Sequence, residues 1–180
     1  RVTEAYGAWP KKPVFFDLGC GVGNLVYAAA FIGEVQWKTC GGIDNIQALV
    51  ERGEKRTPRW LRFSEGFPPE INKVNFMWEQ MDFLENPDPW ADATFILLHW
   101  TAFNSEQLQL AGDVMSQCRE GTLVISFTNP IPNSDFEILV KDRCVSRLFG
   151  AHGHVVRVCL IWLCGIHLVP LLPGGSCDTH

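Results

Sequence analysis

The chain has 180 residues, which is enough for one domain that buries most of its apolar surface. Acidic residues outnumber basic residues by 20 to 15, and the net charge of −5 argues against binding of nucleic acid through bulk positive charge. The seven cysteines include no Cys-x-x-Cys pair, so the sequence predicts no metal site and favours a reducing, intracellular compartment.

The first predicted strand, Val14–Asp17, runs into a glycine-rich loop with the spacing Asp-x-Gly-x-Gly-x-Gly, and a helix is predicted next, over Asn24–Glu34. Glycine has no Cβ and adopts positive φ, so the backbone of such a loop can approach a nucleotide-like ligand closely. The spacing differs from the G-x-G-x-x-G of dinucleotide-binding folds and is similar to the S-adenosylmethionine loop of class I methyltransferases. From this resemblance, the residues expected to bind the cofactor here are Asp17, Gly19, Cys20, Gly21, Gly23 and Asn24.

The second predicted strand, Trp37–Asp44, ends in an acidic residue. The carboxylate of Asp44 can accept hydrogen bonds from both ribose hydroxyls of a nucleoside, as in other Rossmann-type sites. Alternatively, Asp44 caps the helix predicted over Ile46–Arg56, because Asp is a preferred N-cap residue. The glycine-rich loop favours the ribose-binding role.

Basic residues gather on the second predicted helix and just after it, at Arg52, Lys55, Arg56, Arg59 and Arg62. Glutamates are interleaved with them, which is typical of a solvated helix face; a functional patch would instead meet an acidic or phosphate-rich partner. The segment Thr57–Ile71 contains three prolines and is predicted to be a connection without regular structure.

The third predicted strand, Val74–Trp78, is followed by a second candidate for cofactor binding. Asp82 is expected to accept a hydrogen bond from the adenine amino group, while Phe83 packs on the adenine ring. The alternative for Asp82 is an acidic residue in a surface turn.

The remaining strands are predicted over Thr94–Leu98, Leu123–Thr128, Phe136–Asp142 and Val155–Trp162, with a helix over Ser105–Gln117 for which Ser105 is a good N-cap. The last two strands are joined by a short turn around Gly150–Gly153 and should therefore pair antiparallel. The pattern predicts an α/β, Rossmann-like class I methyltransferase fold, with a mostly parallel seven-stranded sheet that ends in an antiparallel hairpin. We expect this domain to span 14–164, between an N-terminal segment (1–13) and a C-terminal tail (165–180).

Together these segments resemble the Dot-one (disruptor of telomeric silencing) family of histone lysine methyltransferases, over roughly Val14–Val158. The family's acidic ribose position falls on Asp44, and its Gly-Asp-Phe adenine segment falls on Met81–Phe83. Phe103 matches the aromatic residue that ends the loop after the fourth strand, and Phe136–Ile138 matches the segment after the fifth. The resemblance implies S-adenosyl-L-methionine as cofactor, a core-histone lysine as substrate and a histone or nucleosome as partner.

Three features depart from the family pattern. The family's Tyr-Gly-Glu loop helps to close the cofactor site, whereas Tyr6–Ala8 reads Tyr-Gly-Ala here. His99–Trp100 stands where the family has an asparagine, and the basic segments that family members use on nucleosomes are absent. Two alternatives therefore stay open: a class I methyltransferase for a small molecule or a non-histone protein, and a non-catalytic module that keeps the fold.

The loop after the fourth predicted strand holds the catalytic candidates His99, Trp100 and Phe103. A lysine amine must lose its proton before it accepts a methyl group, and a tight apolar channel lowers its pKa by desolvation. Trp100 and Phe103 are expected to wall such a channel and to attract the ammonium group; alternatively, both are ordinary core aromatics. His99 is expected to contact the methionine part of the cofactor or to carry the proton.

The resemblance also implies an intracellular, nuclear protein without direct sequence-specific DNA binding. We expect no membrane attachment, because the apolar stretch Val158–Pro173 is too short to span a bilayer comfortably. The chain begins with Arg1 and not with Met, and we expect it to be part of a longer protein. The sequence does not define the oligomeric state.

Overall fold

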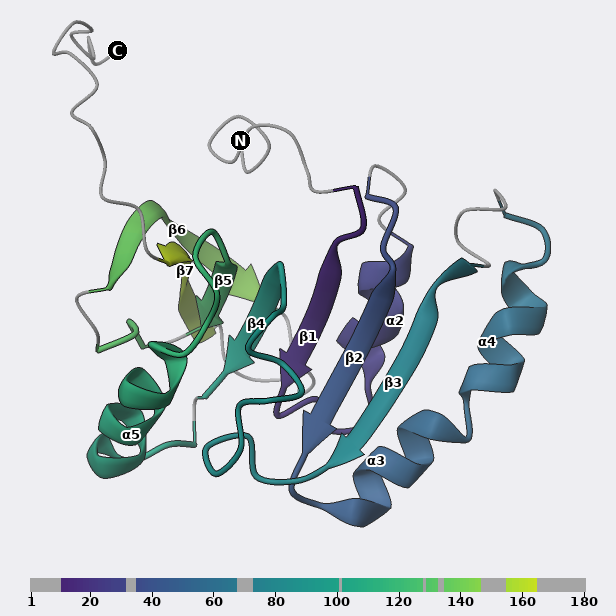
Figure 1. Ribbon diagram of the computed structural model, residues 1–180, viewed down its shortest axis with the longest axis horizontal. Helices are drawn as coiled ribbons and strands as arrows, with labels where there is room; N and C mark the ends of the chain where they lie inside the picture. Colours follow the sequence, from purple (N-terminus) through teal and green to yellow (C-terminus); the bar gives the residue numbers. More distant parts are fainter. Residues whose placement is uncertain are drawn as a thin grey trace, which may run out of the picture.

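The computed structural model describes residues 11–31, 35–67, 73–100, 102–127, 129–132, 135–146 and 155–164, with the backbone alone described beyond residue 136. These residues form a seven-stranded sheet with the strand order β3-β2-β1-β4-β5-β7-β6 (Figure 1). The strands are β1 Val14–Leu18, β2 Thr39–Asp44, β3 Asn75–Gln80, β4 Phe95–His99, β5 Leu123–Phe127, β6 Phe136–Ser146 and β7 Val155–Cys164. β1 to β5 pair in parallel, whereas β7 is antiparallel to both β5 and β6.

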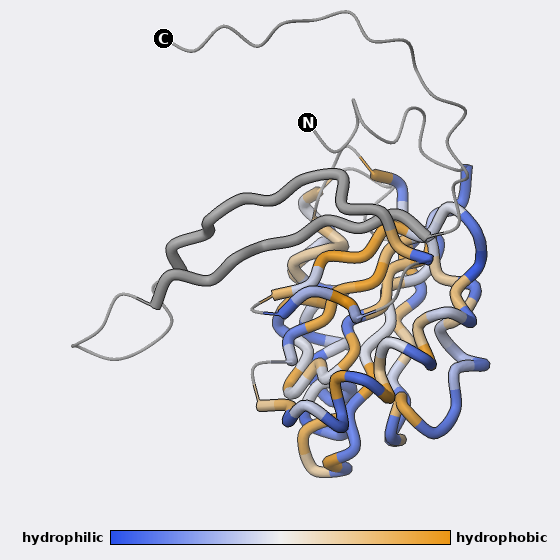
Figure 2. The backbone as a smooth tube through the Cα atoms, turned by 90° about the vertical axis from the view of Figure 1, so that its left-hand side faces the viewer, coloured by the Kyte–Doolittle hydropathy of each residue, from blue (hydrophilic) through white to orange (hydrophobic). Residues whose placement is uncertain are grey.

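The parallel strands alternate with short helices, as the sequence predicts. The helices are α2 Asn24–Ala30, α3 Gln47–Glu54, α4 Thr57–Ser64 and α5 Ser105–Met115. Figure 2 shows hydrophobic segments through the middle of the fold and hydrophilic segments along its outside, as expected for strands that are covered on both faces.

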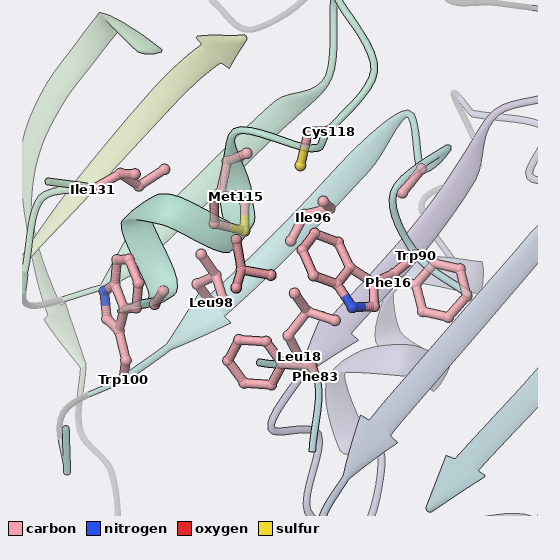
Figure 3. Close-up of a cluster of buried hydrophobic side chains, with 14 of the residues drawn as sticks. Phe16, Leu18, Phe83, Trp90, Ile96, Leu98, Trp100, Met115, Cys118 and Ile131 are labelled. Carbon is pink, nitrogen blue, oxygen red and sulfur yellow. The ribbon is translucent and has the colours of Figure 1, made fainter. Parts of the chain in front are cut away.

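Neighbouring residues of one strand belong to two different cores, one on each face of the sheet. Phe16 packs in the core that contains Ala111 and Met115 of α5, shown in Figure 3. Phe15 packs in the other core, with Val26 of α2. This follows from the strand geometry, in which successive side chains point to opposite faces.

Two predictions about helices are wrong. Thr57–Ile71 is not a connection without regular structure, because α4 occupies Thr57–Ser64 with Pro58 in its first turn. Proline is tolerated there, since its missing N–H has no partner within the first turn of any helix. Ser105 does not cap α5; the N-cap is Asn104, which forms a reciprocal capping box with Gln107.

The carboxyl ends of the parallel strands meet at one edge of the sheet. Leu18 at the end of β1 is paired with Ile43 of β2 on one side and with Leu98 of β4 on the other. Ligands of open α/β sheets bind at this edge. Within the described residues, no helix has the length and apolar character needed to cross a membrane. Tyr6–Ala8, the predicted turn around Gly150–Gly153 and the predicted tail lie outside the described residues.

Candidate functional site

The glycine-rich loop after β1 is anchored to the end of β2 by its backbone. The N–H groups of Gly19 and Cys20 both donate to the carbonyl oxygen of Ile43, at 2.8 and 2.9 Å. Gly19, Gly21 and Gly23 all adopt positive φ, at 81°, 56° and 73°. A side chain in this left-handed region is strained, so three glycines are what this turn requires.

The three glycines have different surroundings. A Cβ atom built on Gly19 or Gly21 would meet no atom of the described part of the chain within 4 Å, so both face space that these residues leave open. A Cβ atom on Gly23 would lie 2.1 Å from the indole ring of Trp78 in β3. Gly19 and Gly21 therefore leave room for a ligand beside the backbone, whereas Gly23 makes room for an aromatic side chain of the protein.

Asp44, at the carboxyl end of β2, fixes the loop from the other side. One carboxylate oxygen accepts a hydrogen bond from the N–H of Gly21 at 2.8 Å, and the other accepts from the N–H of Ile46 at 2.9 Å. The side chain is 9% exposed. Asp44 thus joins the glycine loop to the start of α3, and each oxygen keeps a second lone pair for a further donor.

Asp17, the last polar residue of β1, is a buried acid. It is 2% exposed, and its burial, together with the negative charge of Asp44, raises the pKa of Asp17 to about 7. A buried carboxyl group with this pKa gains a proton or a cationic partner near neutral pH. Asp17 is therefore a buried group whose charge changes near neutral pH, which makes it a candidate site residue.

Cys20 contributes its backbone to the loop but turns its side chain into the fold. Its sulfur would lie 2.8 Å from a Cβ atom built on Gly42, and it packs in the core with Val26. Burial and the nearby Asp17 and Asp44 raise the pKa of the Cys20 thiol to about 12. The thiol is therefore a packed, protonated group and no nucleophile.

The segment after β3 comes next to Asp44. The N–H of Met81 donates to the backbone oxygen of Asp44 at 3.1 Å. One carboxylate oxygen of Asp82 accepts a hydrogen bond from the N–H of Leu84 at 2.9 Å, which is an Asx turn. Asp82 is partly buried, and Asp17, Asp44 and Asp82 all lie where parallel strands end.

Phe83 and Phe103 stack on each other. Their ring centroids are 6.0 Å apart and their planes differ by 12°. Phe83 is 7% exposed and also contacts Trp90, so most of its surface is already covered by protein. Phe103 is half-buried and keeps a surface that a ligand can reach.

Trp100 is a core residue in this structure. It is 1% exposed, and its indole N–H donates to the hydroxyl of Ser126 at 2.8 Å and to the backbone oxygen of Asn129 at 3.2 Å. Figure 3 shows it at one end of the buried cluster. The alternative of a core aromatic therefore describes Trp100, whose burial leaves it no face for a substrate channel. His99 is half-buried at the end of β4, with its ring 5.6 Å from that of Phe127.

Two residues near the edge differ from the sequence-based picture. The side-chain oxygen of Asn24 accepts a hydrogen bond from Arg56 at 2.8 Å, so this side chain is directed toward the start of α4. Ile46, which the sequence analysis does not single out, follows Asp44 at the carboxyl edge and is 54% exposed. Its signal in the sequence is an apolar residue directly after the Asp44 turn. Among the described residues, no group of three or more His, Cys, Asp or Glu side chains could hold a metal ion.

A family described as "Histone methylation protein DOT1" matches residues 8–149. The chain belongs to this DOT1 histone methylation family. The predicted resemblance to the Dot-one family is thereby confirmed, and the chain is an S-adenosylmethionine-dependent methyltransferase by family and fold. A comparison with the curated proteins finds no match.

Solved structures with a similar fold are methyltransferases at low sequence identity. The methyltransferase domain of bacterial CtHen1 has a TM-score of 0.57 at 15% identity, over 90% of this chain and 93% of that one. TrmN from Thermus thermophilus has a TM-score of 0.62 at 12% identity, and the match covers 91% of this chain but 47% of TrmN. The glycopeptide N-methyltransferase MtfA, complexed with S-adenosylmethionine, has a TM-score of 0.57 at 11% identity, over 90% of this chain and 93% of MtfA. The Rossmann-like methyltransferase fold is thus confirmed.

Proposed function

We propose that this protein transfers a methyl group from S-adenosylmethionine to a lysine side chain of a core histone. The observation that supports it most strongly is the family match over residues 8–149, together with a glycine loop whose Gly19 and Gly21 face open space. When bound, S-adenosylmethionine supplies an electrophilic methyl group. This function implies a nuclear location and a nucleosome or free histone as partner.

The carboxyl edge of the sheet offers suitable hydrogen-bond acceptors for the nucleoside part of the cofactor. In this proposal Asp44 accepts hydrogen bonds from the ribose hydroxyls with the lone pairs that Gly21 and Ile46 leave unused. Asp82 accepts from the adenine amino group with the oxygen that does not bond to Leu84. The exposed side chain of Ile46 packs on the adenine ring and excludes water from it.

Asp17 suits the methionine end of the cofactor. Its raised pKa of about 7 reflects a buried carboxyl group that lacks enough positive charge around it. The α-amino group of the cofactor is a cation, and we assign Asp17 as the residue that faces it. The proposed cofactor contacts are Asp17, Gly19, Cys20 through its backbone, Gly21, Asp44 and Asp82, with Ile46 added. Gly23, Asn24 and Phe83 stay in the proposed set as supporting residues, because their own contacts are with Trp78, Arg56 and Trp90.

The substrate lysine enters beside the end of β4 in this proposal. Phe103 is half-buried and stacked on Phe83, so it can form an apolar wall that lowers the pKa of an incoming lysine by desolvation. His99 ends β4 at the same edge. In this proposal it either contacts the methionine part of the cofactor or accepts the proton that the substrate lysine loses. Trp100 is a positioning residue, because its hydrogen bonds hold the loop after β5 to the end of β4.

Two measurements on the same preparation test the proposal. Isothermal titration with S-adenosylmethionine should show saturable binding that Asp44→Ala weakens at least tenfold, which corresponds to about 1.4 kcal/mol. A tritiated-methyl assay should then label a core histone in nucleosomes or free octamers. Binding without histone labelling, with label instead on a small molecule or another lysate protein, would contradict the histone substrate. Absence of cofactor binding would contradict the site itself and favour a non-catalytic module.

A further inference from the structure

A cavity of about 540 Å³ lies between α2 and α4, apart from the site described above. Asn24, Tyr27, Ala28 and Phe31 line one side, and Arg56, Arg59, Trp60 and Phe63 line the other. Both sets have the spacing i, i+3, i+4 and i+7, so each is one face of a helix. Asp17, Asp44 and Asp82 do not line this cavity.

The walls of the cavity are aromatic. The ring centroid of Trp60 lies 3.9 Å from that of Phe31, and this contact connects α4 to the end of α2. Within α4, the ring centroid of Trp60 lies 6.4 Å from that of Phe63. Phe63 is 62% exposed, an unusual exposure for a phenylalanine with this much aromatic contact. The cavity therefore presents flat apolar rings to whatever enters it.

Two arginines contribute to the lining, and none of the described lining residues is acidic. Arg56 donates to the backbone oxygen of Val22 and to the side-chain oxygen of Asn24, and its guanidinium lies 5.6 Å from the ring centroid of Tyr27. These contacts hold one nitrogen of Arg56 and leave further N–H donors. Among the described residues, the ion pair of this region joins Lys55 to Glu51 and includes neither lining arginine.

We propose that this cavity binds a nucleotide unit, with the base against the aromatic wall and the phosphate at Arg56 and Arg59. Guanidinium groups bind phosphate through paired N–H donors, and bases stack on exposed aromatic rings without a sequence requirement. A simple anion would leave the aromatic wall exposed to water, and an apolar group would make no use of the positive charge of Arg56 and Arg59. The volume lies within the range of small-molecule sites.

A free nucleotide and one nucleotide of a single strand share this chemistry. The net charge of −5 argues against an extended nucleic-acid surface, so the recognition is local to the two helices. The site is independent of the proposed cofactor site, since it shares only Asn24 with the residues assigned there. Its ligand would occupy the α2–α4 face while the carboxyl edge stays free.

Uridine monophosphate is the probe, because it lacks the adenine that the cofactor site is assigned to bind. Titrations of the whole chain, saturated with S-adenosylhomocysteine, should show saturable binding. Arg59→Gln should weaken it by about tenfold or more, as for the loss of one hydrogen bond to a charged group. Arg62→Gln removes the same charge from α4 outside the cavity lining and should change affinity by less than about twofold. Phe63→Ala should weaken binding by about fivefold or more, as for the loss of one base-stacking partner.

Short oligouridylate is titrated in parallel. Equal affinity for both probes identifies a free nucleotide as the ligand class, and tighter binding of the oligomer identifies a single strand. The proposal is overturned by absence of saturable binding at millimolar probe or by equal losses in the Arg59 and Arg62 variants. It is also overturned if the probe binds only when S-adenosylhomocysteine is left out, because the probe then occupies the cofactor site. It is also overturned by an acidic peptide that binds with Arg59 dependence when neither nucleotide probe does.

Discussion

The carboxyl edge of the sheet has two halves that are built differently. At the ends of β1 and β2, polar backbone groups and acids surround open space: Gly21 bonds to Asp44, and no residue that the structure describes fills the position that a side chain of Gly21 would take. At the end of β4, aromatic side chains fill the space themselves, with Trp100 at 1% exposure and Phe103 stacked on Phe83.

This difference separates two tasks. The β1–β2 half suits a ligand, because Gly19 and Gly21 leave room and the carboxylate of Asp44 keeps acceptor lone pairs. The β4 half supports that shape, because Trp100 joins the end of β4 to Ser126 and Asn129. Substitutions in the first half should therefore change cofactor binding, and those in the second should first change stability.

The largest expected effect is the loss of stability on substitution in the β4 half of the edge. Trp100→Ala removes a fully buried indole and should lower the free energy of unfolding by about 3–5 kcal/mol, measured by urea denaturation. Phe103→Ala should cost less, because Phe103 is half-buried. Trp100→Phe keeps the volume more closely and serves as the variant that folds. A Trp100→Ala protein with unchanged stability and abolished methyl transfer would make Trp100 a catalytic residue and break the comparison.

The next largest effect is on cofactor binding in the β1–β2 half of the edge. Gly21→Ala places a methyl group in the open cradle and should weaken S-adenosylmethionine binding by tenfold or more, about 1.4 kcal/mol. Gly121→Ala is the matched control, since Gly121 also has positive φ (83°) and no atom within 4 Å of its added Cβ. Both variants should lose about 1–2 kcal/mol of stability through backbone strain, and calorimetric titration should separate them. Equal affinity in both would show that the loop does not face the cofactor.

Local sequence patterns predict the β1–β2 half of the carboxyl edge well. The glycine spacing, the acid at the end of β2 and the alternation of strands and helices are short-range features, and each is visible in a window of a few residues. Asp44 is not the N-cap of α3, because the N-cap is Ile46 and has no side-chain cap. Its carboxylate instead joins the glycine loop to the N–H of Ile46 and keeps lone pairs for a ligand, so ribose binding stays a prediction. The sequence could not show that Gly23 faces Trp78, since that contact joins the loop to β3.

The β4 half of the edge depends on contacts between residues that are far apart in the sequence. Trp100 can be buried because Ser126 in β5 and Asn129 after β5 accept its N–H. A tryptophan after a strand predicts a channel wall as readily as a core residue. The helix α4 was obscured for another reason: Pro58 is a helix breaker in most positions but is tolerated in the first turn, where it lies.

Asp17 makes the first half sensitive to pH. Its native pKa of about 7 is above the value of 3.8 expected without burial, so between these values the native state holds a proton that the unfolded state has lost. Stability of the cofactor-free protein should therefore fall as pH rises through this window, by at most about 1.4 kcal/mol per pH unit. Urea titrations from pH 5 to 8, at about one-unit steps, should show this slope relative to Asp17→Asn. Parallel profiles for the two proteins would place the acid in a less buried environment.

The smallest effect concerns Ile46, which tests whether the open half contacts the adenine ring. Ile46→Ala should weaken S-adenosylmethionine binding by roughly fivefold, because about 1 kcal/mol of apolar burial is lost on binding. Stability should change by less than about 0.5 kcal/mol, since the side chain is 54% exposed. Leu110→Ala is the matched control, 48% exposed on α5, and should alter neither quantity strongly. If the Ile46 variant binds the cofactor as the Leu110 variant does, the adenine ring lies away from the start of α3, and the ribose assignment of Asp44 would have to be revised with it.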